Sequence, residues 1–228
     1  MVNKNSFAPA ELTGKFISLE GGEGVGKSTQ ARLLRDYLED QGIRVILTRE
    51  PGGAPGAEEI RKLLVTGSPD KWDPMTEVLL FYAARVDHLN RTVRPALAQG
   101  TWVISDRYAD STIAYQGAGH GLEAGVILDI HRIATEDFWP DLTLILDADP
   151  ARGLGRANQR EAALCAQQRE DRFEKMERHF HNNLRQAFLD IAKQNPQRCR
   201  VISASGTVEQ VTGHIRQQLA TGFGLKSC

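Results

Sequence analysis

The sequence predicts a doubly wound α/β fold, in which a five-stranded parallel sheet is covered by helices on both faces. Three observations predict it: short and almost continuously apolar runs, stretches between them in which apolar residues recur at helical spacing, and a glycine-rich turn after the first run. Strands that are buried on both faces of a sheet give continuous apolar runs. Their alternation with helices is typical of parallel sheets.

The elements are expected in a regular order along the chain. The first strand, residues 16–19, precedes a helix in which Ala31, Leu34 and Leu38 recur until Gly42 ends it. The remaining expected strands are 45–48, 102–105, 142–146 and 200–202, and the remaining expected helices lie at about 57–65, 76–98, 122–135 and 208–219, with one more between the last two strands. Ligands of such sheets bind beyond the carboxyl ends of the strands, so the residues that follow each strand are the candidates for function.

Length and composition predict one domain. The chain has 228 residues, and no linker rich in Pro, Gly or Ser divides it. We expect residues 1–13 to be a flexible N-terminal extension and residues 14–228 to form the domain. The formal net charge is −1, which provides no general attraction for nucleic acid.

The sequence also argues against a membrane-spanning protein and against a disulfide-stabilised one. The chain has no uninterrupted apolar run of about 18 residues, the length needed to span a bilayer. Its three cysteines, Cys165, Cys199 and Cys228, are odd in number and form no C-x-x-C pair. We therefore expect a cytoplasmic protein.

A phosphate-binding loop follows the first strand. The stretch G-G-E-G-V-G-K-S matches G-x-x-x-x-G-K-[ST] between a strand and a helix, as the motif requires. Its residues are Gly21, Gly22, Glu23, Gly24, Val25, Gly26, Lys27 and Ser28, with Thr29 following. Backbone N–H groups of such a loop cradle phosphates, Lys27 reaches the β- and γ-phosphates, and Ser28 can bind Mg²⁺. The loop predicts a bound nucleoside triphosphate but not the reaction, since kinases, GTPases and motors share it.

Two arginines at strand ends favour a kinase. Arg49 follows the second expected strand and Arg107 follows the third, so both are expected above the phosphate loop, where they can hold an acceptor phosphate. Asp106 ends the third strand and can hold Mg²⁺, directly or through water. The chain contains no N-K-x-D element, which argues against a GTPase.

Six segments in this order resemble the thymidylate kinase family over about residues 14–220. They are the phosphate loop with Glu23, Arg49–Gly53 (R-E-P-G-G), 81–85 (F-Y-A-A-R), 106–108 (D-R-Y), 111–117 (S-T-I-A-Y-Q-G) and 204–207 (A-S-G-T). The resemblance implies a P-loop nucleoside monophosphate kinase fold. It also implies that ATP with Mg²⁺ phosphorylates dTMP, and that the protein is a homodimer formed through the helix at 76–98 or at 122–135.

The resemblance also implies a base and sugar site. Phe81 is expected to stack on thymine and Arg85 to hydrogen-bond it; residues four apart share a helix face, which supports this pairing. Glu23 is expected to accept a hydrogen bond from the 3′-hydroxyl, and Tyr115 to crowd the 2′ position. Ser111, Thr112 and Gln116 are expected near the base, with a polar helix surface as the alternative.

The family resemblance further implies a lid at about residues 152–172. Some thymidylate kinases carry an arginine within the phosphate loop, but Gly24 occupies that position here. The lid is then expected to supply the catalytic arginine, with Arg160 in that role, alongside Lys27, Arg107 and Asp106, and with Arg156 against adenine. The stretch after Arg160 is longer than the family pattern, so Arg169 and Arg172 remain alternatives.

Two other functions stay open at this point. A different P-loop kinase would phosphorylate another monophosphate, which Phe81, Arg85 and Tyr115 argue against. A regulatory ATP-binding module would not need two acceptor-phosphate arginines and a base-stacking segment.

Overall fold

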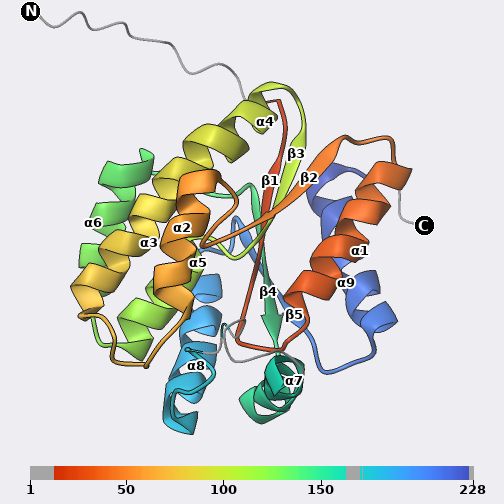
Figure 1. Ribbon diagram of the computed structural model, residues 1–228. Coiled ribbons are helices and arrows are strands. Elements are labelled where there is room, and N and C mark those ends of the chain that lie inside the picture. The colour runs from red at the N-terminus through yellow and green to blue at the C-terminus, as the bar shows by residue number, and fades with distance from the viewer. Residues whose placement is uncertain (1–12, 163–169, 171, 226–228) are drawn as a thin grey trace, which may run out of the picture.

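A parallel sheet forms the centre of the protein (Figure 1). The computed structural model describes residues 13–162, 170 and 172–225. Its strands are β1 (Phe16–Glu20), β2 (Val45–Arg49), β3 (Trp102–Asp106), β4 (Leu142–Asp147) and β5 (Cys199–Ser203). They pair in the order β2-β3-β1-β4-β5, and every pair is parallel. The predicted sheet is confirmed, and each of the first four strands continues one residue beyond its predicted end.

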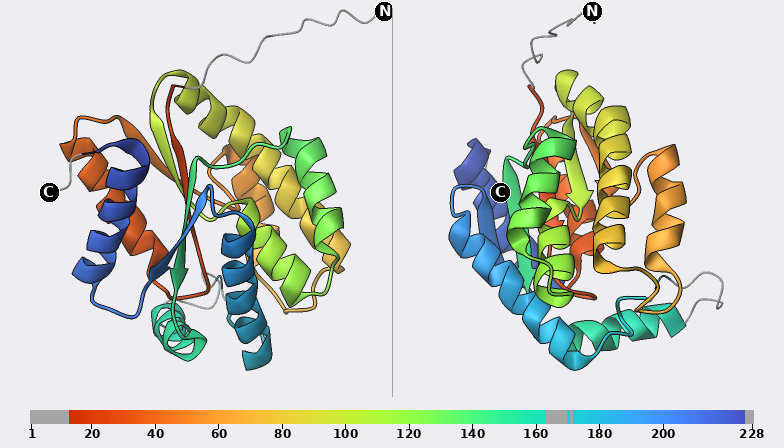
Figure 2. Two further views of the ribbon diagram at one scale, coloured as in Figure 1. Left: turned by 180° about the vertical axis from the view of Figure 1, so that it is seen from behind. Right: turned by 90° about the vertical axis from the view of Figure 1, so that its left-hand side faces the viewer.

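Helices cover both faces of the sheet. On one face α1 (Lys27–Asp40) and α9 (Val208–Phe223) pack side by side; on the other lie α2 (Pro55–Val65), α3 (Pro74–His88), α4 (Arg94–Ala98) and α6 (Ala124–Thr135) (Figures 1 and 2). Alternate residues of β1 point to opposite faces, so Ile17 and Leu19 join the α1/α9 core while Phe16 packs with Leu97 of α4. The remaining helices, α5 (Ala109–Thr112), α7 (Pro150–Ala162) and α8 (Arg178–Gln194), follow strands β3 and β4.

Local capping residues fix where several helices begin. Asp73 caps α3 by accepting hydrogen bonds from the backbone N–H groups of Met75 and Thr76. Thr207 and Gln210 form a reciprocal capping box at the start of α9. Gly26 has a left-handed backbone with φ of 102°, which turns the phosphate loop directly into α1.

The helix predicted at 76–98 is continuous but not uniformly α-helical. A π-helical segment, Leu89–Val93, separates α3 from α4. Pro95 follows that segment, and its ring can neither donate a backbone hydrogen bond nor fit against the carbonyl four residues earlier in a regular α-helix. The wider turn just before Pro95 lets the helix continue past it.

One helical segment was not predicted. After β3 the chain enters α5 and then a second π-helical segment, Ile113–Gly119. The sequence A-D-S-T-I-A-Y-Q-G has Ser, Asp and Gly among its residues and no apolar repeat at helical spacing. This segment carries four of the residues that the resemblance assigns to the acceptor site.

None of the helices in the described part of the chain has the length and apolar character needed to span a bilayer. Residues 1–12 of the predicted N-terminal extension lie outside the described residues, as do residues 163–169 and 171 of the predicted lid.

Candidate active site

A cavity of about 410 Å³ opens beyond the carboxyl ends of β1, β2 and β3. All nine residues predicted for the acceptor nucleotide line it: Glu23, Arg49, Phe81, Arg85, Arg107, Ser111, Thr112, Tyr115 and Gln116. Gly24, Lys27, Ser28 and Asp106 line the same cavity. The structure therefore brings the predicted acceptor residues and the phosphate loop into one site.

The phosphate loop connects β1 to α1 through residues 21–26, with Lys27, Ser28 and Thr29 in the first turn of α1. Lys27 folds back on the loop, and its Nζ donates to the carbonyl oxygens of Gly21 at 3.0 Å and Gly22 at 2.6 Å. Burial, together with the nearby positive charge of Arg107, lowers the pKa of Lys27 to about 8. A bound phosphate would add negative charge beside Lys27 and so stabilise its charged form. The lysine is therefore suited to an anionic ligand.

Ser28 and Asp106 meet beside the loop. The Ser28 hydroxyl donates to Oδ2 of Asp106 at 2.6 Å. A hydroxyl and a carboxylate oxygen are the hard ligands that Mg²⁺ prefers, and Mg²⁺ usually takes one or two carboxylates together with phosphates and water. These two side chains therefore fit the predicted metal site.

Arg107 is held in a strained backbone conformation and by several hydrogen bonds. Its φ is 74°, a left-handed value that costs a non-glycine residue roughly 1–2 kcal/mol. Its Nη1 donates to the carbonyl of Gly21 at 2.9 Å and to Ser111 Oγ at 3.0 Å, and Nη2 lies 3.4 Å from Glu23 Oε1. The guanidinium thus has a fixed position between the phosphate loop and the acceptor side of the cavity.

Glu23 is a buried carboxylate surrounded by donors. Tyr115 donates its hydroxyl to Oε1, and Nδ1 of His181 lies 3.4 Å from Oε2. Burial alone would raise the pKa of Glu23, but His181 and the positive charges of Arg107 and Lys27 outweigh it and lower the pKa to about 2. The side chain is therefore an ionised acceptor, as contact with a sugar hydroxyl requires.

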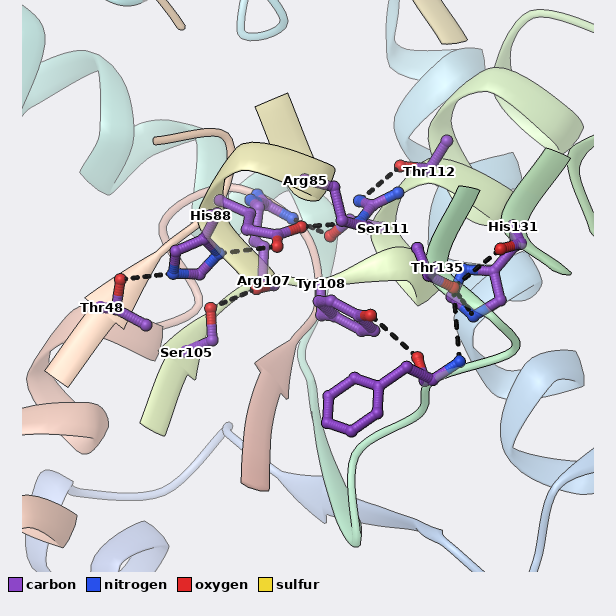
Figure 3. A network of polar contacts seen from close by, with 12 residues as sticks. Thr48, Arg85, His88, Ser105, Arg107, Tyr108, Ser111, Thr112, His131 and Thr135 are labelled. Atoms are coloured by element: carbon purple, nitrogen blue, oxygen red, sulfur yellow. Dashed lines mark hydrogen bonds and ion pairs between the residues drawn. The ribbon is translucent and has the colours of Figure 1, made fainter. Parts of the chain in front are cut away.

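The far end of the cavity contains a buried ion-pair network (Figure 3). Arg85 Nε donates to Glu50 Oε2 at 2.8 Å and Nη2 donates to Thr112 Oγ1 at 2.9 Å. His88 Nδ1 lies 2.8 Å from Glu50 Oε1, and its Nε2 lies 2.8 Å from Thr48 Oγ1. The Arg85 guanidinium also lies over the rings of Tyr82 and Tyr108, so its position is set from several sides.

Ser111, Thr112 and Gln116 are buried, with 9%, 2% and 0% of their surface exposed. The alternative that they form a polar helix surface is wrong, because α5 buries Ser111 and Thr112 and the π-helical segment that follows it buries Gln116. Phe81 is partly buried, lines the cavity and packs against Phe173 with ring centroids 6.4 Å apart.

Of the four arginines named for the lid, Arg156 and Arg172 have side chains in the described part of the chain. Arg156 is exposed on α7, and Arg160 belongs to the same helix with its side chain outside the described part. Arg169 lies outside the described residues. Arg172 is buried, forms an ion pair with Glu77 and donates to the carbonyls of Leu64, Ser68 and Pro69, so it is not free to approach a phosphate.

Helix α7 packs closely against the phosphate loop. A Cβ atom added at Gly24 would overlap the carbonyl oxygen of Gly153, and one added at Gly153 would overlap the carbonyl oxygen of Glu23. Gly24 also has φ of 62°, which favours glycine. The start of the predicted lid thus lies backbone to backbone on the loop.

Sequence reasoning assigned no role to Glu50, Glu77, Phe173 and His181, which contact predicted site residues, or to His88, which contacts Glu50. A signal existed for three of them. Glu50 lies just after the second strand, at the ligand-binding end of the sheet. Glu77 and His88 lie on the helix of Phe81 and Arg85, at spacings of three or four residues that share a face. Nothing in the local sequence around Phe173 or His181 connects them with the cavity.

The chain is similar to known thymidylate kinases over most of its length. The family model described as "Thymidylate kinase" matches residues 19–215. The thymidylate kinase of Caulobacter vibrioides is 50% identical over 212 residues, which cover 93% of this chain and 99% of that protein. The thymidylate kinase of Rhizorhabdus wittichii is 47% identical over 209 residues, covering 92% and 98%. The crystal structure of thymidylate kinase from Ehrlichia chaffeensis has a TM-score of 0.70 and 35% identity, and covers 90% of this chain and 98% of that chain.

Proposed function

Because the chain belongs to the thymidylate kinase family and transfers a phosphoryl group from ATP to dTMP, we propose that dTMP binds in the cavity at the ends of β1, β2 and β3. The observation that carries this proposal is the convergence of all nine predicted acceptor residues on that cavity, beside the phosphate loop. Lys27 and the N–H groups of residues 21–29 hold the triphosphate, and Arg156 contacts the adenine.

Ser28 and Asp106 would hold Mg²⁺, either directly or with Asp106 acting through water. The hydrogen bond between them supports this assignment, since it brings a hydroxyl oxygen and a carboxylate oxygen, both ligands suited to Mg²⁺, together beside the phosphate loop. When bound, Mg²⁺ neutralises charge on the β- and γ-phosphates.

The acceptor phosphate of dTMP is held by Arg49 and Arg107. Arg107 is preorganised, whereas Arg49 is half-exposed and paired with Glu58 at 3.0 Å, an interaction that it can exchange for phosphate. The acceptor oxygen is already anionic near neutral pH, so no side chain has to remove a proton from it. Catalysis consists of alignment and stabilisation of charge on the transferred group.

The nucleoside occupies the deeper part of the cavity. Phe81 stacks on the thymine, while Arg85, Ser111, Thr112 and Gln116 surround its polar edge. Glu23 accepts a hydrogen bond from the 3′-hydroxyl, and the Tyr115 ring, fixed by its hydroxyl on Glu23, stands against the 2′ position.

A comparison of acceptors tests the proposed site. ADP release with Mg-ATP is measured with dTMP, dUMP, ribosyl TMP, dCMP and AMP at equal concentrations. We expect dTMP to be preferred over dCMP and AMP because of the base contacts, and over ribosyl TMP because of Tyr115. Equal rates with dTMP and ribosyl TMP would contradict the role of Tyr115 and leave the base site standing.

Residues 152–172 act as a lid that brings Arg160 to the transferred phosphoryl group. Replacing Arg160 with alanine should lower kcat by roughly a hundredfold or more, since a lost transition-state charge contact costs about 10²–10³ in rate, while KM for dTMP changes little. Steady-state kinetics with varied dTMP and saturating Mg-ATP measures both constants. Arg156→Ala is the comparison, and it should raise KM for ATP; an unchanged kcat in the Arg160 variant would contradict the catalytic role.

We also propose that residues 14–228 form one domain, that the protein is cytoplasmic, and that it is a homodimer. Exposed apolar side chains on two adjacent helices support the dimer: Leu79 of α3 is 53% exposed, and Leu128 and Ile133 of α6 are 44% and 79% exposed. Covering this surface with a second copy would remove apolar area from water. Sedimentation velocity of the purified protein measures the state directly.

A further inference from the structure

Two buried polar atoms of opposite character lack partners at the nucleoside end of the cavity. Arg85 Nη1 is a donor and Gln116 Oε1 is an acceptor, and neither has a hydrogen-bond partner within the described part of the chain. Both side chains line the cavity and are almost completely buried, at 2% and 0% exposure. A buried polar atom without a partner is costly, so the pair indicates a ligand that supplies one acceptor and one donor.

Glu77 determines which atom of the Gln116 amide is left without a partner. Gln116 Nε2 donates to Glu77 Oε1 at 2.7 Å, and both side chains are buried. Glu77 forms an ion pair with Arg172 through Oε2, and a carboxylate in an ion pair only accepts hydrogen bonds. The amide nitrogen therefore has to face Glu77, which leaves the oxygen for the ligand.

The partner of Glu77, Arg172, is fixed by the surrounding backbone. Arg172 donates to the carbonyls of Leu64, Ser68 and Pro69, at distances of 2.8 to 3.0 Å, and so keeps its guanidinium against Glu77. His120 approaches the same carboxylate, with Nε2 at 3.8 Å from Oε1, but burial lowers the pKa of His120 and favours its neutral form. Arg172 is thus the principal partner of the Glu77 charge.

The two free atoms match one class of pyrimidine. Thymine and uracil present a donor, N3–H, next to an acceptor, O4; cytosine presents an acceptor, N3, next to a donor, the N4 amino group. Gln116 Oε1 can accept from N3–H while Arg85 Nη1 donates to O4. Cytosine would place acceptor against acceptor and donor against donor.

We propose that Glu77 is a positioning residue that makes this enzyme select thymine or uracil over cytosine, by holding the Gln116 amide in one orientation. The inference rests on the proposed dTMP site and adds a residue that need not touch the substrate. The Gln116 orientation is not expected to discriminate between dTMP and dUMP, because thymine and uracil present the same N3–H donor and O4 acceptor.

The variant Glu77→Gln tests the proposal, because a neutral amide can donate as well as accept and so permits Gln116 to rotate. The ratio of kcat/KM for dTMP to kcat/KM for dCMP should fall by at least about tenfold, the scale of one hydrogen bond at such a site. Part of the fall should come from a rise in kcat/KM for dCMP. His120→Gln is the matched control, since it changes another neighbour of Glu77 and should leave the ratio unchanged.

A double-variant cycle separates orientation from general damage. In a Gln116→Leu background, Glu77→Gln should no longer change the dTMP to dCMP ratio. If the wild-type enzyme prefers dTMP and Glu77→Gln lowers both activities with an unchanged ratio, Glu77 is only structural and the inference is overturned. If the wild-type enzyme shows no preference for dTMP over dCMP, the proposed base site itself fails.

A second measurement needs no change at Glu77 and remains available if that variant does not fold. Side-chain amide NMR of the wild-type enzyme with bound dTMP should show the thymine imino proton protected from exchange. The nuclear Overhauser effect between that proton and the Gln116 NH₂ protons should be weak, because the Gln116 amide oxygen lies between them. Close contact between the NH₂ protons and the base would overturn the proposal.

Discussion

Replacing Arg107 with methionine is expected to lower kcat/KM for dTMP roughly a thousandfold, the upper range for loss of one preorganised charged donor. Contacts to the Gly21 carbonyl, Ser111 and Glu23 hold Arg107 at the place proposed for the acceptor phosphate. Methionine keeps much of the length but provides no charge or fork of N–H groups. Initial rates over a range of dTMP concentrations, at saturating Mg-ATP, measure the change.

Arg49→Met is the comparison for Arg107→Met. Arg49 lines the same cavity, but it is half-exposed and its hydrogen bonds in the structure go to Glu58, so its contribution is less preorganised. We expect this variant to act mainly through a higher KM and to lose less activity than the Arg107 variant. Equal losses in the two variants would show that the strained, partly buried placement of Arg107 adds nothing to its contribution.

Replacing Glu50 with glutamine is expected to lower the free energy of unfolding by roughly 3 kcal/mol, the scale of removing one partner from a buried ion pair. Glu50 is 4% exposed and bonds both Arg85 and His88. The neutral amide leaves the buried Arg85 charge without its counter-ion. Urea unfolding at pH 7 measures the difference, and the exposed Glu59→Gln, which only loses a surface pair with Lys62, should change it by less than about 1 kcal/mol.

The stability difference between wild type and Glu50→Gln should also depend on pH. Burial raises the pKa of Glu50, but Arg85 and His88 outweigh it, so the pKa lies below the ordinary value of 4.5. A lowered carboxyl pKa stabilises the folded state fully above the ordinary value, and this contribution is lost as pH falls through the lowered value. The gap between the two proteins should therefore be widest above pH 4.5 and narrow in more acidic solution; a gap that widens on acidification would contradict the ion-pair interpretation.

The sequence was sufficient for those features that local patterns determine. Apolar runs located all five strands, and the phosphate loop was placed because its glycines, Lys27 and Ser28 are consecutive. Arg49 and Arg107 could be named because they follow expected strands. The other seven acceptor residues were named from the family resemblance, which the four-residue spacing of Phe81 and Arg85 supports. Their roles in binding and catalysis remain predictions.

The interactions that position those residues could not be read from local patterns. Glu50 lies 35 positions from Arg85 and 38 from His88, so their pairing depends on how β2 and α3 meet in the fold. His181 approaches Glu23 only because α8 packs beside the phosphate loop. The burial of Ser111, Thr112 and Gln116 depends on α5 and the π-helical segment after it, which no sequence periodicity marked.

The backbone contact between Gly24 and Gly153 bears on how this family could diversify. An arginine introduced at position 24 would drive its Cβ into the carbonyl of Gly153 and would also have to adopt a left-handed backbone. Such a substitution would displace α7, the helix that carries Arg160. An arginine in the loop therefore requires a compensating change in α7, so under the proposed role of Arg160 the loop and the helix would have to change together for the charge to move from one to the other.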